Sequence, residues 1–429
     1  MTGSPYHRSH VDRPAASLRS APTPHRARWT RRHVLLGAAG IGTLSTGGFW
    51  STRGTQVRPL LAAGTPGAAV DDELRVATSG WKTDFTKHSV PLGEITSGGP
   101  PRDGIPPIDA PRYVAIAEAD GWLEAREPVI AVVGEGRAGP VARAYPLQIM
   151  VWHEIVNDVL ADRPTLVTFC PLCNTAIAFD RRLDVDGLIY DFGTTGNLRF
   201  SDLVMWDRQT ESWWQQLSGE AIVGALTGRR LTPVPAQILG WETFKAAYPA
   251  GDVLSRETGH FRPYGDNPYP GYDDIDSTPF LFEGNLDGRL APMERVVGLA
   301  VGDEAVAYAF PALAGHRAVN ERVGGQEVVV LYAPGARSAL DAATIAGSRD
   351  TGQAGVFHRR LDDRLLTFHP DGNDRFVDLE TGTIWDVTGR GVDGVLAGRT
   401  LTPVPHTVVF WFAWAAAYPN TRLWTTSDA

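Results

Sequence analysis

The spacing of the two cysteines is the feature of the sequence that points most directly to chemistry. Cys170 and Cys173 form a Cys-Pro-Leu-Cys segment directly after residues 165–169, which we expect to be a β-strand. A turn of this kind can direct two thiolates towards one ion, and sulfur ligands suit copper or zinc. The spacing therefore predicts a metal site, with copper slightly favoured by its affinity for thiolates in an exported protein.

His153 is the candidate for a third ligand. It lies in residues 147–160, for which we expect a helix just before the strand that ends at Cys170. Three protein ligands would leave one position of a four-coordinate ion open for water or a substrate. The alternative is a histidine that hydrogen-bonds a turn, because His316 takes the matching position in a segment without cysteines.

Two other interpretations of Cys170 and Cys173 stay open. In an oxidising compartment the pair could form a reversible or structural disulfide, and buried thiols can also be inert. A thioredoxin-like redox motif fits poorly, because residues 174–180 are strand-like where that motif would open a helix.

A second group of polar residues lies among tryptophans in residues 207–215. Here Glu211 could serve as acid, base or ligand, and Gln215 could orient a bound group. The alternative is a β-hairpin in which Asp207 and Thr210 bond the backbone of their own turn.

Composition and charge exclude several classes of function. The formal net charge is −9, but residues 1–64 hold nine arginines against the single acid Asp12, which leaves −17 for the rest. Such an acidic body should repel nucleic acids and anionic membranes. The chain also has no Gly-x-Ser-x-Gly, His-Glu-x-x-His or phosphate-binding glycine motif, so hydrolase and nucleotide-dependent activities lose most support.

The N-terminal residues resemble a twin-arginine export signal. Arg31 and Arg32 precede a short, glycine-interrupted apolar run at residues 34–50. This run suits a cleaved leader better than a permanent span, although an N-terminal membrane anchor is the alternative. We expect export across the cytoplasmic membrane to the envelope or exterior, with membrane contact only through an uncleaved leader.

Internal similarity organises the rest of the chain. Residues 231–235 recur as 401–405, and residues 153–157 align with 316–320, while Ala333 and Ala336 stand where the cysteines would be. Loss of both thiols together suggests a joint role in the first copy. The predicted divisions are residues 1–64 (signal and linker), 65–125 (irregular segment), 126–255 (first repeat), 256–290 (connecting loop) and 291–429 (second repeat).

Each repeat has an α+β, β-rich pattern, and we expect the two halves to be related by a pseudo-two-fold axis. Short β-branched runs bounded by glycine predict strands at residues 129–133 and 141–145. Residues 233–248 are expected to end each pattern as a helix that Pro249 stops.

Four ordered motifs carry a resemblance to a known family. Residues 98–109, 152–158, 170–174 and 207–212 resemble the bacterial family catalogued as domain of unknown function 3179, over about residue 81 to the C-terminus. The resemblance implies an exported or envelope protein and transfers no reaction. It makes the following residues reasonable to test: Asp103, Asp109, His153, Cys170, Cys173, Glu211 and Gln215.

These observations favour an exported protein whose first repeat holds copper or zinc with His153, Cys170 and Cys173. In its enzymatic form, the site performs redox chemistry on a small substrate. The alternative is a non-catalytic envelope module that binds a small molecule or another envelope protein and carries a Cys170–Cys173 disulfide. The sequence by itself favours neither an enzyme nor a binding protein.

Overall fold

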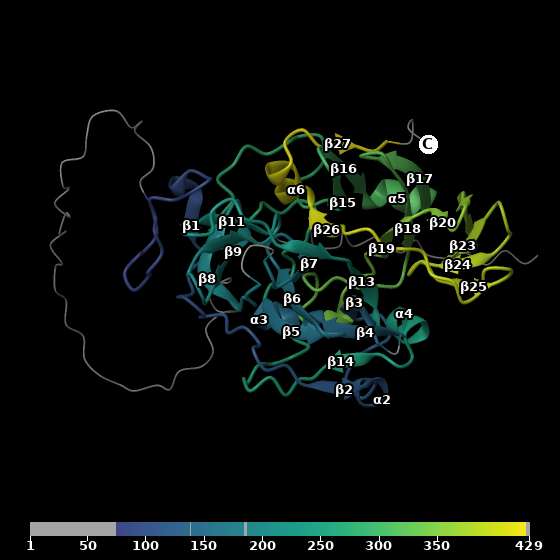
Figure 1. Ribbon diagram of the computed structural model, residues 1–429, viewed down its shortest axis with the longest axis horizontal. Helices are drawn as coiled ribbons and strands as arrows, with labels where there is room; N and C mark the ends of the chain where they lie inside the picture. The colour runs from purple at the N-terminus through teal and green to yellow at the C-terminus, as the bar shows by residue number, and fades with distance from the viewer. Residues whose placement is uncertain (1–73, 138, 184–186, 426–429) are drawn as a thin grey trace, which may run out of the picture.

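The computed structural model describes residues 74–137, 139–183 and 187–425. The predicted export signal, with Arg31 and Arg32, lies outside the described residues. Strands dominate and the helices are short, so the coarse prediction of a β-rich α+β protein is confirmed (Figure 1). None of the described helices has the length and apolar composition needed to span a bilayer.

Three sheets make up the N-terminal half, residues 95–254. The first has the order β13 (Ala236–Gly240), β3 (Pro128–Gly136), β4 (Gly139–Pro146), β14 (Asp252–Leu254), β2 (Tyr113–Ala115). The second runs β12 (Thr232–Val234), β7 (Thr175–Asp180), β6 (Arg163–Cys170), β5 (Ile155–Leu160). The third runs β1 (Ile95–Ser97), β8 (Phe192–Arg199), β9 (Asp202–Asp207), β10 (Trp213–Gln215), β11 (Glu220–Val223). The helices are η1 (Leu92–Glu94), α2 (Ile116–Ala119), α3 (Leu147–His153) and α4 (Trp241–Ala247).

The C-terminal half, residues 295–423, has four sheets. The first sheet has the order β26 (Thr407–Phe410), β15 (Arg295–Val301), β16 (Glu304–Ala309), β27 (Arg422–Leu423). The second has the order β17 (Ala318–Val323), β18 (Gln326–Ala333), β19 (Gln353–His358). The third has the order β22 (Phe368–Asp371), β23 (Arg375–Asp378), β24 (Ile384–Asp386), β25 (Gly391–Asp393), and the fourth is the small hairpin of β20 (Arg360–Leu361) and β21 (Arg364–Leu365). The helices are α5 (Phe310–His316), η2 (Ile345–Gly347) and α6 (Trp411–Ala417). In Figure 1 the green and yellow strands of this half lie towards the upper right, beside the teal strands of the N-terminal half.

The strands predicted at residues 129–133 and 141–145 are confirmed as β3 and β4, which pair antiparallel. The helix predicted for residues 147–160 is wrong in its second part. It ends at His153 because Glu154 takes a left-handed backbone conformation (φ +59°), and the β-branched residues that follow pair with β6 as strand β5. The helix predicted for residues 233–248 is likewise limited to α4, because residues 236–240 pair with β3 as β13.

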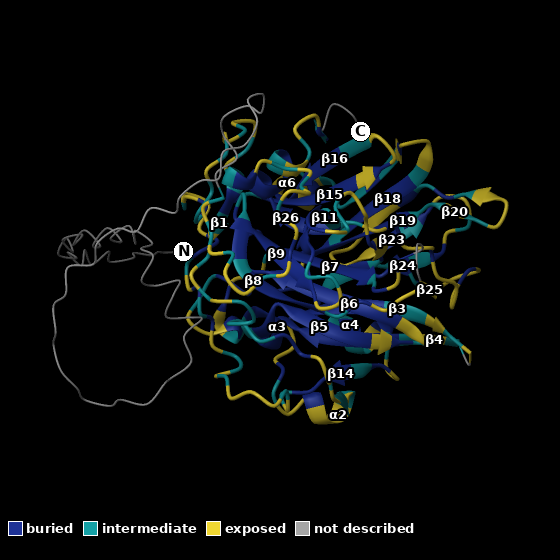
Figure 2. Ribbon diagram, turned by 60° about the vertical axis from the view of Figure 1, so that its left-hand side comes forward, coloured by how far each residue is buried: buried dark blue, intermediate teal, exposed yellow. Residues whose placement is uncertain are grey.

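The interior of the N-terminal half is built on β6, β7 and β9, whose side chains are almost all buried on both faces (Figure 2). Strand β26 of the C-terminal half packs beside β7, and the amide of Phe410 donates a 2.9 Å hydrogen bond to the carbonyl oxygen of Cys173. The turn that carries the cysteines is therefore fixed from both halves of the chain.

A bulge in β8 allows the proline-rich segment, residues 98–109, to pack against the sheet. The register of β8 on β9 shifts between Thr194 and Asn197, and Gly196 in this bulge has φ +77°. A Cβ atom on Gly196 would overlap the carbonyl oxygen of Pro100, so only glycine fits both the conformation and the space.

We predict that Gly196→Ala destabilises the protein by about 3 kcal/mol, because it combines positive-φ strain with a collision against backbone. Gly228→Ala is the matched control: its φ is +84°, but a Cβ there would meet no atom within 4 Å. The control should cost about 1 kcal/mol. Urea unfolding of both variants checks this, and equal costs would contradict the close packing of Pro100 on Gly196.

Candidate metal centre

The two cysteines lie at the ends of a tight turn between β6 and β7. Cys170 is the last residue of β6, and Asn174, with φ +56°, leads the chain back into β7. The turn brings the Sγ atoms of Cys170 and Cys173 to 3.1 Å from each other, and both thiols are free and buried. The separation exceeds the covalent S–S length of about 2.05 Å, so no disulfide joins the two residues in this structure, and their sulfur atoms lie side by side.

Asp202 supplies a third potential ligand. It is the first residue of β9, directly after Phe200 and Ser201, which both have positive φ and turn the chain towards the cysteines. Its Oδ1 atom lies 3.3 Å from the Sγ atom of Cys173, and ligand atoms of Cys170, Cys173 and Asp202 all lie within 4.8 Å of one another. This buried group could hold a metal ion.

The carboxylate of Asp202 is held in place by its second oxygen. Its Oδ2 atom accepts hydrogen bonds from the amide of Leu217, at 3.0 Å, and from the Nε2 atom of Gln215. Gln215 is itself buried and also contacts Arg199. Gln215, chosen from the sequence as an orienting residue, therefore contacts the candidate ligand Asp202 directly.

Glu154 adds a second carboxylic acid to the two thiols and Asp202. Burial, and then the nearby charge of Asp202, raise the pKa of Glu154 to about 8, and no cationic side chain of the described residues offsets them. Burial raises the pKa of Asp202 to about 6 and that of Cys173 well above its ordinary value. We call Cys170, Cys173, Asp202 and Glu154 the thiol–carboxylate cluster.

A small cavity opens beside this cluster. It measures about 40 Å³ and is lined by Glu154, Leu172, Asn197 and Tyr269, among others. The loop between the two halves covers it: the hydroxyl of Tyr272 donates a 3.0 Å hydrogen bond to the carbonyl oxygen of Leu172. The space suits a single water or a ligand of a few atoms.

His153 does not join the group of candidate ligands. Its Nδ1 atom lies 2.8 Å from the carbonyl oxygen of Pro106, and its Nε2 atom lies 2.7 Å from the hydroxyl of Tyr264. Burial lowers the pKa of His153 to about 4, so the ring is neutral at pH 7. Because the backbone turns at Glu154, Glu154 rather than His153 extends towards Asp202, and Asp202 replaces His153 as the third candidate ligand.

Glu211 lies apart from the candidate ligands and anchors the N-terminal segment. Its carboxylate accepts a 2.7 Å hydrogen bond from the amide of Lys82 and forms an ion pair with Arg102 at 3.2 Å. Although burial opposes ionisation, these contacts hold the pKa of Glu211 below its ordinary value. The geometry fits an anchor better than the acid, base or ligand that the sequence suggested.

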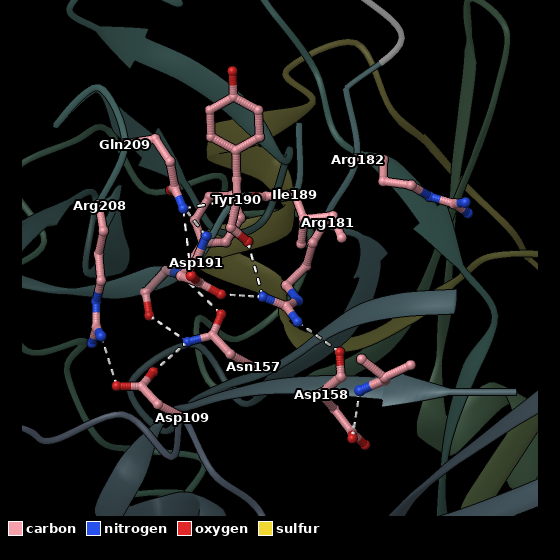
Figure 3. A network of polar contacts seen from close by, with 12 residues as sticks. Asp109, Asn157, Asp158, Arg181, Arg182, Ile189, Tyr190, Asp191, Arg208 and Gln209 are labelled. Carbon is pink, nitrogen blue, oxygen red and sulfur yellow. Dashed lines mark hydrogen bonds and ion pairs between the residues drawn. The ribbon is translucent and has the colours of Figure 1, made fainter. Parts of the chain in front are cut away.

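The two aspartates of the proline-rich segment also make structural contacts. Asp103 accepts hydrogen bonds from the amide of Thr194 and the indole of Trp206. Asp109 lies between Asn157 and Arg208, 2.7 Å from each (Figure 3). Both carboxylates attach this segment to the sheets of the N-terminal half.

The sequence interpretation missed Asp202 and Glu154. Neither residue belongs to a ligand-spacing motif, and in the segment that contains Glu154 the sequence predicted the neighbouring His153 as the ligand. A usable indication was present in the internal similarity: where the second segment loses both cysteines, it also has Arg317 in place of Glu154.

Comparison with known proteins identifies the family of the chain. The family model described as "Protein of unknown function (DUF3179)" matches residues 102–421, so the chain belongs to this family. No curated protein and no solved structure matches the chain. The predicted resemblance is thereby confirmed, and the chemistry has to be argued from the geometry alone.

We predict that Glu154 makes the metal-free protein less stable as the pH rises from about 4.5 to about 8, the ordinary and raised pKa values of this group, while the lowered pKa of His153 acts in the opposite direction below about 6.5. In this window the folded state keeps a proton that the unfolded state releases, so the free energy of unfolding falls with increasing pH. Thermal unfolding of chelator-treated protein at pH 5 and pH 8 measures the loss. Glu154→Gln should have a flatter pH profile; an unchanged slope in this variant would contradict the assignment.

Proposed function

We propose that this DUF3179 protein is an exported metalloprotein that binds one zinc ion in the thiol–carboxylate cluster. The observation that carries the proposal is the burial of two thiols and two carboxylates, against which no cationic side chain of the described residues forms an ion pair. Cys170, Cys173 and Asp202 form the group of suitable ligand atoms, and Glu154 stands beside it. A divalent cation would compensate the buried negative charge that these groups carry when deprotonated.

The C-terminal half supports this interpretation as an internal comparison. The strand order β13-β3-β4-β14 is paralleled by β26-β15-β16-β27, and β8-β9-β10-β11 is paralleled by β22-β23-β24-β25. In both halves an Asn side chain bonds both backbone polar groups of a Phe: Asn157 with Phe192, and Asn320 with Phe368. We infer an internal duplication from these similarities.

At the position that matches Glu154, the C-terminal half has the cationic side chain of Arg317. Arg317 has the same left-handed backbone as Glu154 (φ +63°), and its guanidinium donates to the carbonyl oxygen of Gly372. Gly372 lies in the turn between β22 and β23. In the N-terminal half, Ser201 lies in the turn between β8 and β9, and its carbonyl oxygen is 3.4 Å from the Sγ atom of Cys173. Arginine thus stands in the half without thiols where the other half gathers acids, as expected if the acids serve a bound cation.

The ligand set favours zinc over copper. Copper(I) prefers soft sulfur donors, whereas zinc binds thiolates and carboxylates together. With Asp202 in place of His153, the candidate ligands are two sulfurs and one oxygen. A four-coordinate ion held by these three ligands would keep one position free for a small ligand.

A zinc ion in this position would act as a Lewis acid on a small ligand in the cavity. Glu154 is the neighbouring carboxyl that would accept or donate a proton there, since it lines the small cavity. Gln215 would keep Asp202 oriented through its hydrogen bond. The site would accordingly suit a substrate of only a few atoms.

The setting of this function is also part of the proposal. Arg31 and Arg32 support export by the twin-arginine route, which carries folded proteins and would allow the metal to be loaded before export. The acidic body argues against nucleic-acid partners, and a small molecule or another envelope protein remains the proposed partner. Membrane contact would occur only through an uncleaved leader.

A binding module with a Cys170–Cys173 disulfide is the second candidate. The observation that favours it is the 3.1 Å separation of the two Sγ atoms, from which oxidation needs only a small movement. The two candidates differ in what they require: a disulfide needs neither Asp202 nor Glu154.

We predict that protein purified after native export contains about one zinc per chain, and that Cys170→Ser with Cys173→Ser abolishes binding. Asp202→Asn should weaken zinc affinity by about tenfold or more, because a charged ligand is lost. Elemental analysis and competition with a chromogenic chelator measure both effects.

Two control variants separate ligation from loss of fold. Asp207→Asn changes a buried aspartate at the other end of β9 that bonds Trp214, and His153→Gln changes the neighbour of Glu154. Both should keep stoichiometric zinc. Protein without metal and with oxidised thiols would instead establish the disulfide, and loss of zinc in His153→Gln would restore histidine as a ligand.

A further inference from the structure

A cleft between the two halves of the chain lies outside the metal centre. Its volume is about 540 Å³. One wall comes from β3, β4 and the end of α4, and the opposite wall comes from β19 and residues 398–403. The volume lies in the range of about 300–1,000 Å³ that is usual for small-molecule sites.

The walls of the cleft are largely apolar. Ala131, Val133 and Ala142 line one side, and Phe357 and Leu401 line the other. Phe357 and Leu401 are buried, so they provide a firm surface rather than mobile side chains. An apolar ligand body would find contacts on both sides at once.

Arg390 brings a positive charge into this cleft. Within the described part of the chain, its guanidinium forms no ion pair and no side-chain hydrogen bond, and it lies 5.6 Å from the centre of the Tyr248 ring. The neighbouring carboxylate of Asp386 accepts hydrogen bonds from Thr388 and from the amide of Arg390 within its own turn, and the charge of Arg390 also attracts it at a longer range than an ion pair. Glu135, the other acid, is exposed at the cleft's edge.

We propose that the cleft binds a small organic acid, whose apolar body lies between Ala142 and Phe357 and whose carboxylate or sulfonate pairs with Arg390. An arginine in a largely apolar cleft favours an anionic group, because a guanidinium offers several donors to two acceptor oxygens. Tyr248 provides an aromatic face next to that pair. This site is independent of the metal centre.

The experiment compares two fluorescent probes with the same aromatic body. 8-Anilinonaphthalene-1-sulfonate carries a sulfonate, and N-phenyl-1-naphthylamine lacks it. We expect the full chain to bind the anionic probe at one saturable site, and Arg390→Gln to weaken that binding by about tenfold while it changes the binding of the neutral probe little. Arg364→Gln, on exposed β21, is the matched control and should change neither.

A second variant tests the position of the site without altering the core. Thr402→Trp fills the exposed edge of the cleft and should weaken binding of both probes. The proposal is overturned if the anionic probe does not bind, or if its affinity is the same in Arg390→Gln and Thr402→Trp as in the unchanged chain. Circular dichroism of each variant verifies that the fold is retained.

Discussion

Burial of Cys170, Cys173, Asp202 and Glu154, with no cationic side chain paired to them in the described part of the chain, is the constraint on which the rest of the structure depends. Removing a carboxylate from water disfavours its charged form strongly, and the raised pKa values of Glu154 and Asp202 express that cost. A fold keeps such a costly group when the group does something that apolar side chains cannot. A bound cation, as we propose, would turn this cost into an attraction.

The fold meets this constraint by placing the thiol and carboxylate side chains at the ends of strands and helices. Cys170 closes β6, Asp202 opens β9, and Glu154 occupies the left-handed residue between α3 and β5. Because strands and their turns have few soft torsions, the ligand atoms are held close together before any ion arrives. The connecting loop then covers the cluster and limits access to a small cavity.

Sequence patterns predicted the parts of this arrangement that depend on local chemistry. The strands around residues 129–145 and the cysteine turn follow from β-branched runs and spacing, which act over a few residues. The helix through His153 failed at Glu154, because the chain reverses there in favour of pairing with β6, a tertiary effect. For the same reason the sequence did not predict Asp202 as a ligand. Asp202 lies about thirty residues after the cysteines in the chain and approaches them only because β9 pairs with β8.

The two halves differ at the cysteines and at the position of Glu154 together. If the cysteines were ordinary core residues, their replacement by Ala333 and Ala336 would not require any change at Glu154. Instead, the half that lacks thiols has Arg317 at that position, with the same backbone conformation and a contact to the matching turn. The half with thiols gathers carboxylates that a cation would balance, whereas the half without thiols has a cationic side chain at the position of Glu154. Under the duplication that we infer, an acid accompanies the cysteines in one half and an arginine takes its place where they are absent. This difference links Glu154 to the cysteines, a link that the Cys-x-x-Cys spacing by itself does not reveal.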